Sequence, residues 1–428
     1  MNRREFLMAT GAAMLPLPAF ASDTPNVLVL IADDMRADLM GVAGNNIVKT
    51  PNLDQLAREG TYFPNAFVTT SVCPTSRASI MLGQYATNHK NIDFKTPLSS
   101  WQWETSYHGR LKSAGYRTGY VGKWGLGGPA PTGFDLYEGF SGAGQYIKPG
   151  RKHLTDHLAD RAIEFLKDNN EPYCLTVGFW APHAERADDP TPAEARFKAL
   201  YENVEYPKPA TFIWDYNSGL PDSLQERYAK ILFNEQLSTP DRYRNFLIGY
   251  LGLITGMDAA IGRILQNVDL DNTLIVFLSD NGFFLGEHGR PGKWLAHEES
   301  IRVPFILKVP GVSGPSTKLA LNIDVAPTIY GALGWPHDRD GINLLDAERE
   351  DFFCEYLLPA FGAAGIRTRT KKFVTMPEHS FEMAFDLVSD PLEQNNLALQ
   401  NPDWVGTLRD KVIQRYGSSP FIPPTQFQ

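Results

Sequence analysis

Two apolar, strand-like runs, each of which ends close to carboxylate side chains, constrain the fold of this chain more than any other feature. The first run begins after Asn26, reads Val-Leu-Val-Leu-Ile-Ala and ends at Asp33 and Asp34. The second is a strand-like run at 272–278 that reads Asn-Thr-Leu-Ile-Val-Phe-Leu, and it is followed by Ser-Asp-Asn-Gly at 279–282. Such runs are typical of strands that are covered on both faces of a sheet. They predict an α/β fold with a buried central sheet.

Further strand-like and helical segments alternate along most of the chain. The strand candidates are 116–121, 173–179 and 303–309, and the helical patterns cover 53–59, 156–167 and 246–267. This alternation predicts a large, mostly parallel sheet flanked by helices, with functional sites beyond the carboxyl ends of its strands. Asp258 and Arg263 interrupt the apolar helix well short of bilayer length, so we interpret it as a core helix and expect no membrane span.

The character of the chain changes near Asp346. Short strand-like pieces and a terminal helix follow, at 352–356, 372–375, 382–387 and 403–416. We therefore predict a main α/β domain at 22–345 and a small α+β subdomain at 346–428. Residues 185–237 are rich in proline, charge and aromatics without clear periodicity, which predicts a long loop excursion over the functional face.

The amino terminus is similar to a twin-arginine export signal. Arg3 and Arg4 precede a short apolar run that proline interrupts and that ends in Ala-Phe-Ala at 19–21. We predict a signal peptide at 1–21, too short to span a bilayer, and a folded protein exported to the periplasm or beyond.

Composition restricts the class of partner. The formal net charge is −9 and no basic cluster is present, which argues against nucleic acid because phosphate binding needs concentrated lysine and arginine. An anionic substrate must therefore be attracted by local groups. The spacing of Cys73, Cys174 and Cys354 predicts neither a disulfide framework nor a zinc site, and we expect the last two to be buried.

The polar ends of the two apolar runs predict a metal site. Asp33, Asp34, Asp280 and Asn281 would meet at one sheet edge and offer hard oxygen ligands, which suit Ca²⁺ or Mg²⁺. Either pair alone is more often part of a turn or a helix cap. Their repetition after two buried strands favours a cation, because uncompensated carboxylates would repel one another.

Cys73 opens the sequence Cys-Pro-Thr-Ser-Arg at the start of an amphipathic stretch that reaches Tyr85. If Cys73 caps a helix and Pro74 lies in its first turn, Arg77 shares the face of the sulfur, and the helix dipole favours negative charge there. This predicts a nucleophile with a depressed thiol pKa. The alternative is a small buried hydrophobe beside a surface arginine.

Four further side chains could bind a tetrahedral anion held on the metal, namely Lys123, His183, His288 and Lys293. Together with these residues, the order of the motifs along the chain resembles that of a type I sulfatase of the alkaline phosphatase superfamily. The resemblance covers nearly the whole length after the predicted signal peptide. The matching segments are Asp33-Asp34, Thr50-Pro51-Asn52-Leu53-Asp54, Cys73-Pro74-Thr75-Ser76-Arg77, Gly122-Lys123-Trp124, Ala181-Pro182-His183, Ser279-Asp280-Asn281-Gly282, Gly286-Glu287-His288-Gly289, Glu298-Glu299-Ser300, Asp324-Val325-Ala326-Pro327-Thr328 and Phe385-Asp386-Leu387.

The resemblance implies an alkaline phosphatase-like fold and hydrolysis of sulfate esters. It implies that formylglycine-generating machinery converts Cys73 to formylglycine, whose hydrated aldehyde attacks sulfur and later expels sulfate. The four oxygen ligands would hold Ca²⁺, or Mg²⁺, together with residue 73. Arg77 would help to stabilise the alkoxide, and Lys123 and Lys293 would share the sulfuryl charge.

The resemblance also implies a histidine that protonates the leaving oxygen. His183 is the first candidate, in contact with the sulfate, and His288 is the second. Two departures affect the nucleophile: Thr75 occupies the usual place of a proline, and Gly125 stands where the family commonly has a histidine. His89 or His288 is a candidate replacement for that histidine.

Three functions stay open on the sequence. The first is hydrolysis of sulfate esters on carbohydrates, for which the aromatic residues at 201–216 could stack on sugar rings, although loop packing explains such aromatics more often. The second is a phosphodiesterase or phosphonate monoester hydrolase on the same scaffold. The third is an unmodified Cys73 protein that binds a sulfated ligand with little turnover.

Overall fold

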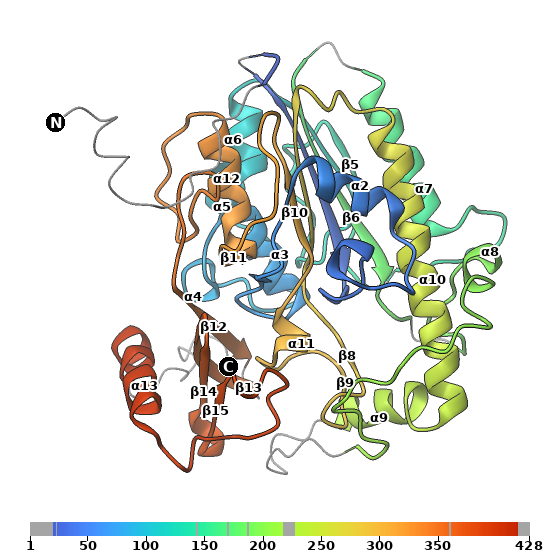
Figure 1. Ribbon diagram of the computed structural model, residues 1–428. Helices are drawn as coiled ribbons and strands as arrows, with labels where there is room; N and C mark the ends of the chain where they lie inside the picture. The colour runs from blue at the N-terminus through green and yellow to red at the C-terminus, as the bar shows by residue number, and fades with distance from the viewer. Residues whose placement is uncertain are drawn as a thin grey trace.

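A computed structural model describes residues 20–417 except 23, 143, 169–170, 186–187, 217–226 and 359–360. Its main part is a seven-stranded sheet between two layers of helices, and its C-terminal part is a four-stranded antiparallel sheet with one helix (Figure 1). Residues 1–19 of the expected signal peptide lie outside the described residues.

The main sheet has the order β2-β10-β7-β1-β6-β4-β5. Its strands are β1 (Asn26–Asp33), β2 (Thr61–Tyr62), β4 (Arg117–Lys123), β5 (Leu136–Phe140), β6 (Tyr173–Pro182), β7 (Thr273–Ser279) and β10 (Phe305–Lys308). β1 lies at the centre, parallel to β6 and β7, and β4 and β5 continue this parallel arrangement.

The expected α/β sheet is confirmed, with one antiparallel exception. β10 runs antiparallel to β7 and to β2. The segment between β7 and β10 holds only the two-residue strands β8 (Phe284–Leu285) and β9 (Pro291–Gly292) and the short helix α11 (Glu298–Ile301). A parallel return needs a crossover of a dozen residues or more, usually a helix. No helix of that length is described there, so the chain re-enters the sheet in the opposite direction.

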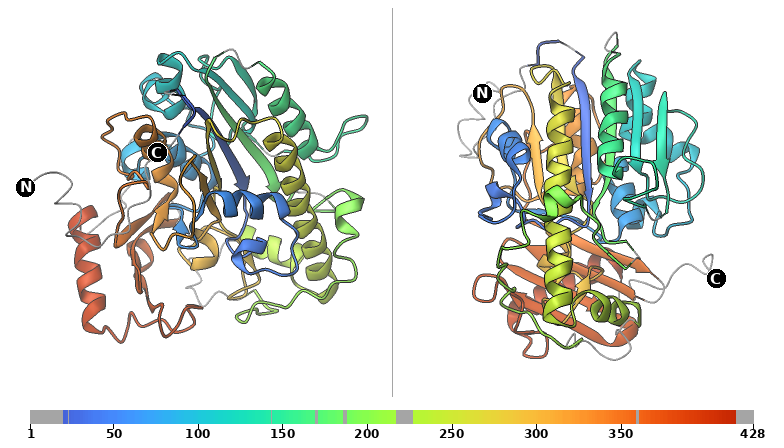
Figure 2. Two further views of the ribbon diagram at one scale, coloured as in Figure 1. Left: turned by 45° about the horizontal axis from the view of Figure 1, so that its top comes forward. Right: turned by 90° about the vertical axis from the view of Figure 1, so that its right-hand side faces the viewer.

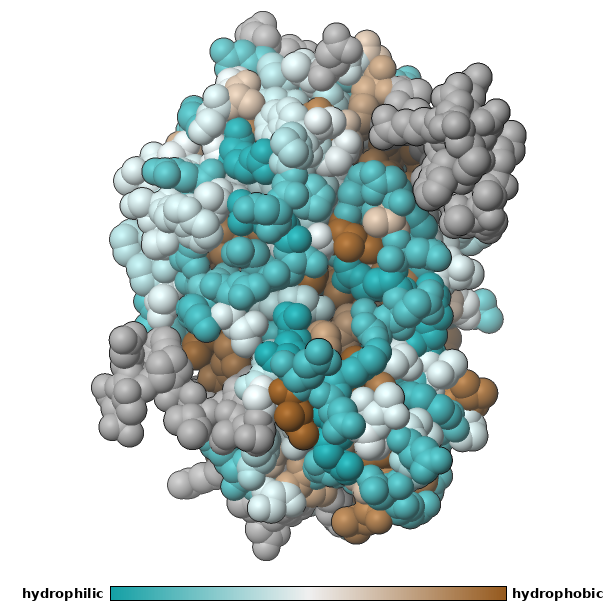
Figure 3. Space-filling model, turned by 90° about the vertical axis from the view of Figure 1, so that its left-hand side faces the viewer, coloured by the Kyte–Doolittle hydropathy of each residue, from teal (hydrophilic) through white to brown (hydrophobic). Residues whose placement is uncertain are grey.

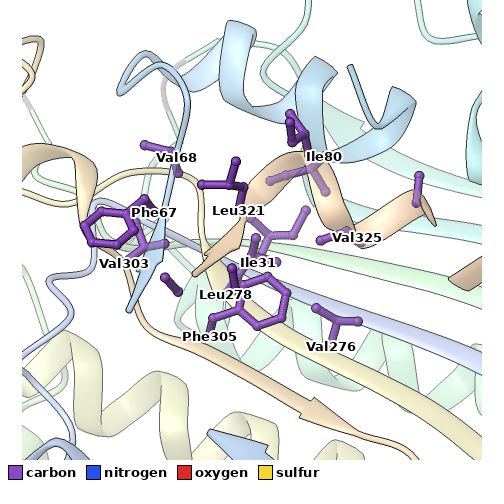
Figure 4. Close-up of a cluster of buried hydrophobic side chains, with 14 of the residues drawn as sticks. Ile31, Phe67, Val68, Ile80, Val276, Leu278, Val303, Phe305, Leu321 and Val325 are labelled. Carbon is purple, nitrogen blue, oxygen red and sulfur yellow. The ribbon is translucent and has the colours of Figure 1, made fainter. Parts of the chain in front are cut away.

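Helices cover both faces of the main sheet. On one face lie α2 (Pro51–Glu59), α7 (Leu154–Leu166) and α10 (Pro240–Leu265), and on the other α3 (Cys73–Leu82), α6 (Tyr107–Ser113) and α12 (Val325–Ala332). Leu28 and Leu30 of β1 pack into the core beneath α10, whereas Val29 and Ile31 pack into the opposite core. Burial on both faces explains the uninterrupted apolar run. Figure 4 shows Ile31 beside Leu278, Phe305 and Val325.

Helix α10 extends along its face of the sheet (Figure 2). Among the described helices it is the one whose length and composition would suit a membrane span, and 78% of its apolar window is buried inside the protein. It packs against α7, α2 and β6, which is the core position expected from its sequence.

The remaining elements connect this frame. They are β3 (Ala66–Phe67), α4 (Ala86–His89), α5 (Ser100–Thr105), α8 (Ala195–Lys198), α9 (Arg227–Gln236) and β11 (Ala320–Leu321). The predicted excursion at 185–237 is therefore partly helical. Its residue Ile213 donates a backbone hydrogen bond to the carbonyl of Gly286, 3.1 Å away, so this segment lies against the loop between β8 and β9.

The C-terminal part contains β12 (Asp351–Leu358), β13 (Phe361–Thr368), β14 (Lys371–Met376), β15 (Phe381–Asp386) and α13 (Asp403–Tyr416). The sequence did not predict β13, because its Gly-Ala-Ala-Gly stretch lacks the side chains that mark strands. One face of this sheet packs on α13 and the other joins the core of the main domain.

On the face of the molecule that Figure 3 shows, apolar residues are scattered among polar ones. The domain boundary at 346 stays a prediction.

Candidate active site

The ends of β1 and β7 and the start of α3 bring four potential metal ligands together. Ligand atoms of Asp33, Asp34, Cys73 and Asp280 all lie within 4.8 Å of one another, and all four residues are buried. β1 and β7 are parallel neighbours in register, so their carboxyl ends meet at one edge of the sheet. Asp34 has a φ of 66°, a left-handed conformation that aspartate tolerates better than most residues.

Hydrogen bonds fix the two strand ends to each other. The backbone N–H of Asp34 donates to Asp280 Oδ1 at 3.3 Å, and the N–H of Met35 donates to Ser279 Oγ at 2.9 Å. The side-chain amide of Asn281 donates to Asp34 Oδ1. The structure therefore brings together all four residues predicted as oxygen ligands.

Cys73 is the first residue of α3, and Val72 is its N-cap, so the prediction that Cys73 caps the helix is wrong by one position. Cys73 Sγ lies 3.5 Å from Asp33 Oδ1 and 3.6 Å from Asn281 Oδ1. The predicted depression of the thiol pKa is also wrong. Burial, together with the charges of Asp280 and Asp33, raises the pKa of Cys73 to about 12.

Arg77 is fully buried, which rules out the surface arginine of the alternative interpretation. Its Nε donates to Asp280 Oδ2 at 2.8 Å, and its Nη1 donates to the carbonyl of Lys123 at 2.6 Å. Tyr120, which the sequence did not single out, donates its hydroxyl to the same carbonyl at 2.6 Å. A tyrosine in a buried strand has no motif that would mark it as part of a site.

Two lysines complete the charge balance around Cys73. Lys123 forms an ion pair with Asp33, and Lys293 forms one with Asp34. Lys293 Nζ also lies 2.8 Å from Cys73 Sγ. Burial alone would raise the pKa of Asp33 and of Asp34, but Lys123, Lys293 and His183 outweigh it, so both pKa values lie below the ordinary range. Both carboxylates are therefore ionised at neutral pH.

The donor set fits a hard divalent cation. Carboxylate oxygens of Asp33, Asp34 and Asp280 lie within 4.8 Å of one another, and the amide oxygen of Asn281 lies 3.6 Å from Cys73 Sγ in the same cluster. Oxygen ligands are those that Ca²⁺ and Mg²⁺ prefer. In this structure the ammonium groups of Lys123 and Lys293 compensate two of the carboxylates. A cation bound by the same oxygens would leave those lysines available to an anion.

His183 lies at the open side of the cluster. Its Nε2 is 3.6 Å from Asp34 Oδ2, and its Nδ1 lies 2.7 Å from the carbonyl of Ala184, to which it would donate. Burial lowers the pKa of His183, and the carboxylates of Asp34 and Asp33 offset this only in part. The side chain is 27% exposed, against at most 3% for the carboxylates and Lys123.

The structure places the other two candidate histidines elsewhere. His288 Nε2 lies 3.7 Å from Glu299 Oε1, and its ring packs 4.9 Å from that of His297. His89 has both ring nitrogens engaged, 3.0 Å from Ser79 Oγ and 3.0 Å from the N–H of Asn91. Among the described residues, Cys73 Sγ makes its polar contacts with Asp33, Asn281 and Lys293 and not with either histidine.

Gly125 lies beside the site although it contributes no side chain. Its φ is +75°, and a Cβ at this position would lie 2.7 Å from Arg77 Cδ. The missing histidine would therefore have been next to Arg77.

Trp180, another residue without a sequence signal, lies beside two of the predicted site residues. Its ring centroid is 4.2 Å from that of His183, and Lys123 Nζ lies over the same ring at 4.6 Å from the centroid.

Residues 25–335 match the family model described as Sulfatase. The chain is 28% identical to the N-acetylglucosamine-6-O-sulfatase of Bacteroides thetaiotaomicron, with 87% of this chain and 82% of that protein covered. A solved protein in complex with its substrate D-glucosamine-2-N,6-O-disulfate is similar at a TM-score of 0.78 and 25% identity, covering 92% of this chain and 97% of that one.

The phosphonate monoester hydrolase of Agrobacterium radiobacter shares the fold, with a TM-score of 0.75, 21% identity and coverage of 91% and 95% of the two chains. The family model covers most of the chain, including the cluster of acidic residues around Cys73 and the three cations that face it. The chain therefore belongs to the sulfatase family of the alkaline phosphatase superfamily.

Proposed function

We propose that this protein hydrolyses sulfate esters of amino sugars or related carbohydrates at the site around Cys73. The observation that carries the proposal is the convergence of Arg77, Lys123 and Lys293 on a buried carboxylate cluster beside Cys73. Amino-sugar sulfates are the class named for the Bacteroides relative and for the substrate-bound structure, which supports the carbohydrate assignment.

We infer that Asp33, Asp34, Asp280 and Asn281 hold a Ca²⁺ ion and that Cys73 is converted to formylglycine. When present, the ion supplies positive charge to the reacting oxygens and the modified residue supplies a hydroxyl nucleophile. Export by the twin-arginine route is part of the same proposal, since it delivers a protein that already carries its ion and its modification.

The side chains of this protein have separate tasks in that reaction. Lys123 and Lys293 bind sulfate oxygens through their ammonium groups, and Arg77 holds Asp280 while adding positive charge near residue 73. His183 places Nε2 at the open side of the site, where a proton on that atom can pass to the leaving oxygen. A bound anion raises the pKa of His183, because it stabilises the charged imidazolium.

The exposed groups suggest how the substrate enters. His183 at 27% and Lys293 at 10% have the most exposed side chains around Cys73. The sulfate group would therefore pass between them while the sugar stays outside. The aromatics at 201–216 do not carry this proposal, because Tyr201 is buried and Phe212 packs 4.7 Å from Trp214.

A substrate panel tests the function. The purified protein is assayed with nitrophenyl sulfate, a nitrophenyl phosphodiester, a nitrophenyl phosphonate and glucosamine 6-sulfate. We expect the sulfates to be turned over fastest. Turnover of the phosphorus esters alone would identify a phosphonate or phosphodiester hydrolase. Binding of inorganic sulfate without turnover of any ester would identify the ligand-binding protein.

A further inference from the structure

Lys372 is a buried cation outside the site around Cys73. It lies on β14 of the C-terminal sheet and is fully buried. It shares the inner face of that sheet with Val374, which belongs to the core joined to the main domain. A buried lysine is costly unless it is paired and hydrogen-bonded, so the contacts of Lys372 identify what it holds.

Those contacts lead to the segment that follows Lys293. Lys372 Nζ donates to the backbone carbonyl of Ala296 at 2.8 Å and pairs with Glu298 Oε1 at 2.8 Å. It also pairs with Glu393 Oε1 at 2.7 Å. The other carboxylate oxygen of Glu393 accepts from the N–H of Glu298, which begins α11, at 2.7 Å.

The segment held in this way is short and tightly bent. Lys293 follows β9 directly, and Trp294 after it has a φ of 88°, a conformation that is rare for a side chain of this size. Ala296 and Glu298 lie three and five positions after Lys293. Figure 1 shows α11 lying between the main domain and the C-terminal sheet. A strained bend persists only where its surroundings determine it.

A second contact ties the same sheet to the approach to Cys73. Tyr356 of β12 places its hydroxyl 2.6 Å from Ser71 Oγ, two residues before Cys73, and Ser71 Oγ lies 3.4 Å from the carbonyl of Leu295. The inner face of the C-terminal sheet therefore contacts two segments of the chain near the site. One is Ser71, just before Cys73, and the other is Ala296, just after Lys293.

We propose that Lys372 is a positioning residue that fixes the backbone after Lys293, so that the Lys293 ammonium is held at residue 73 for sulfate binding. The proposal rests on the proposed function for the role of Lys293. It gives the C-terminal sheet a task at the active site, although Lys372 touches none of the residues that would contact the sulfate.

Replacement of Lys372 alone would leave buried Glu393 without its counterion. The working variant is therefore Lys372→Met/Glu393→Gln, in which the glutamine can still accept from the N–H of Glu298. Glu298 keeps its ion pair with Arg367, at 3.0 Å. The matched control is Lys371→Met on the same strand, because Lys371 pairs with Asp386 where both side chains are partly exposed.

The experiment is a double-mutant cycle between this paired change and Lys293→Met, with thermal unfolding measured for every protein. We expect the paired variant to unfold cooperatively and to lose about tenfold or more in kcat/KM for nitrophenyl sulfate, since small misplacements of a binding group are costly. Added to Lys293→Met, the paired change should cause no further loss, because coupled residues are not additive. Lys371→Met should retain wild-type kinetics.

Each other outcome is decisive. If the losses multiply in the cycle, or if the paired variant is as active as wild type, Lys372 does not act through Lys293. If wild-type protein turns over no sulfate ester, the proposed function fails, and the same cycle is then measured as the affinity for inorganic sulfate by calorimetry. Absence of both turnover and sulfate binding in wild type would overturn both proposals.

Discussion

Lys293 Nζ lies 2.8 Å from Cys73 Sγ, although 220 positions separate the two residues in the chain. Burial alone would lower the pKa of Lys293, but Asp34 and Cys73 outweigh it, so the pKa lies well above the usual value. A permanent positive charge therefore stands beside residue 73. The unmodified thiol is protonated at neutral pH, which makes it a poor nucleophile despite that charge.

Conversion of Cys73 is the first prediction. Mass spectrometry of the peptide spanning residues 73–77, from protein produced with formylglycine-generating machinery, should show the aldehyde. Cys73→Ala should abolish turnover, whereas Cys174→Ala, at a buried cysteine away from the site, should leave kcat unchanged. Exchange of the two residues in Pro74→Thr/Thr75→Pro should raise the converted fraction. Full activity with an intact thiol would contradict the formylglycine mechanism.

Metal binding should stabilise the fold. The cation relieves the repulsion between Asp33, Asp34 and Asp280 in the folded protein. A ligand that binds only the folded protein and is present at 100 times its Kd raises the free energy of unfolding by about 2.7 kcal/mol. Thermal unfolding after chelation, and then with Ca²⁺ or Mg²⁺ restored, measures the effect for each ion. Asp280→Asn should reduce the shift and the exposed Asp403→Asn should keep it. Identical melting with and without both ions would argue against the site.

The two histidines should differ in their effect on catalysis. His183→Gln should lower kcat by about 10²–10⁴-fold for an alkyl sulfate, the usual range for a lost general acid, and by less for nitrophenyl sulfate, whose leaving group needs no proton. His288→Gln should have a smaller effect, because His288 pairs with Glu299. Steady-state kinetics with both substrates decides this. Equal losses for the two substrates would show that His183 does not protonate the leaving group.

Buried His89 should make the protein sensitive to acid. Burial lowers the pKa of His89 to about 3, against 6.5 for an ordinary histidine. Below pH 6.5 the unfolded chain binds a proton that the native state does not, so the free energy of unfolding decreases as the pH is lowered. Between pH 7.5 and 5.5 this should cost about 1.4 kcal/mol. In denaturant unfolding, His89→Gln should lose about 1.4 kcal/mol less of its free energy of unfolding than wild type between these two pH values. The matched control is His157→Gln at an exposed position, which should lose as much as wild type.

Much of the frame was predictable from local patterns. The two apolar runs identified β1 and β7, and the helix predicted at 403–416 is α13 with the same bounds. Patterns of this kind are predictive because strands that are buried on both faces consist mostly of apolar residues. The sequence did not reveal the direction of β10 or the existence of β13, since the first depends on the connection to β7 and the second on small residues without a strand signal.

The acidic residues and the asparagine around Cys73 were likewise predictable from the sequence, because parallel strands deliver their carboxyl ends to one edge of a sheet. The sequence alone thus determined the fold class, the acidic residues at the strand ends and the cysteine beside them. Only the tertiary structure decided that the thiol pKa rises, that His89 and His288 pair with groups other than Cys73, and that Lys372 contacts the segment after Lys293. These properties depend on burial and on contacts between residues far apart in the chain, which no local pattern encodes.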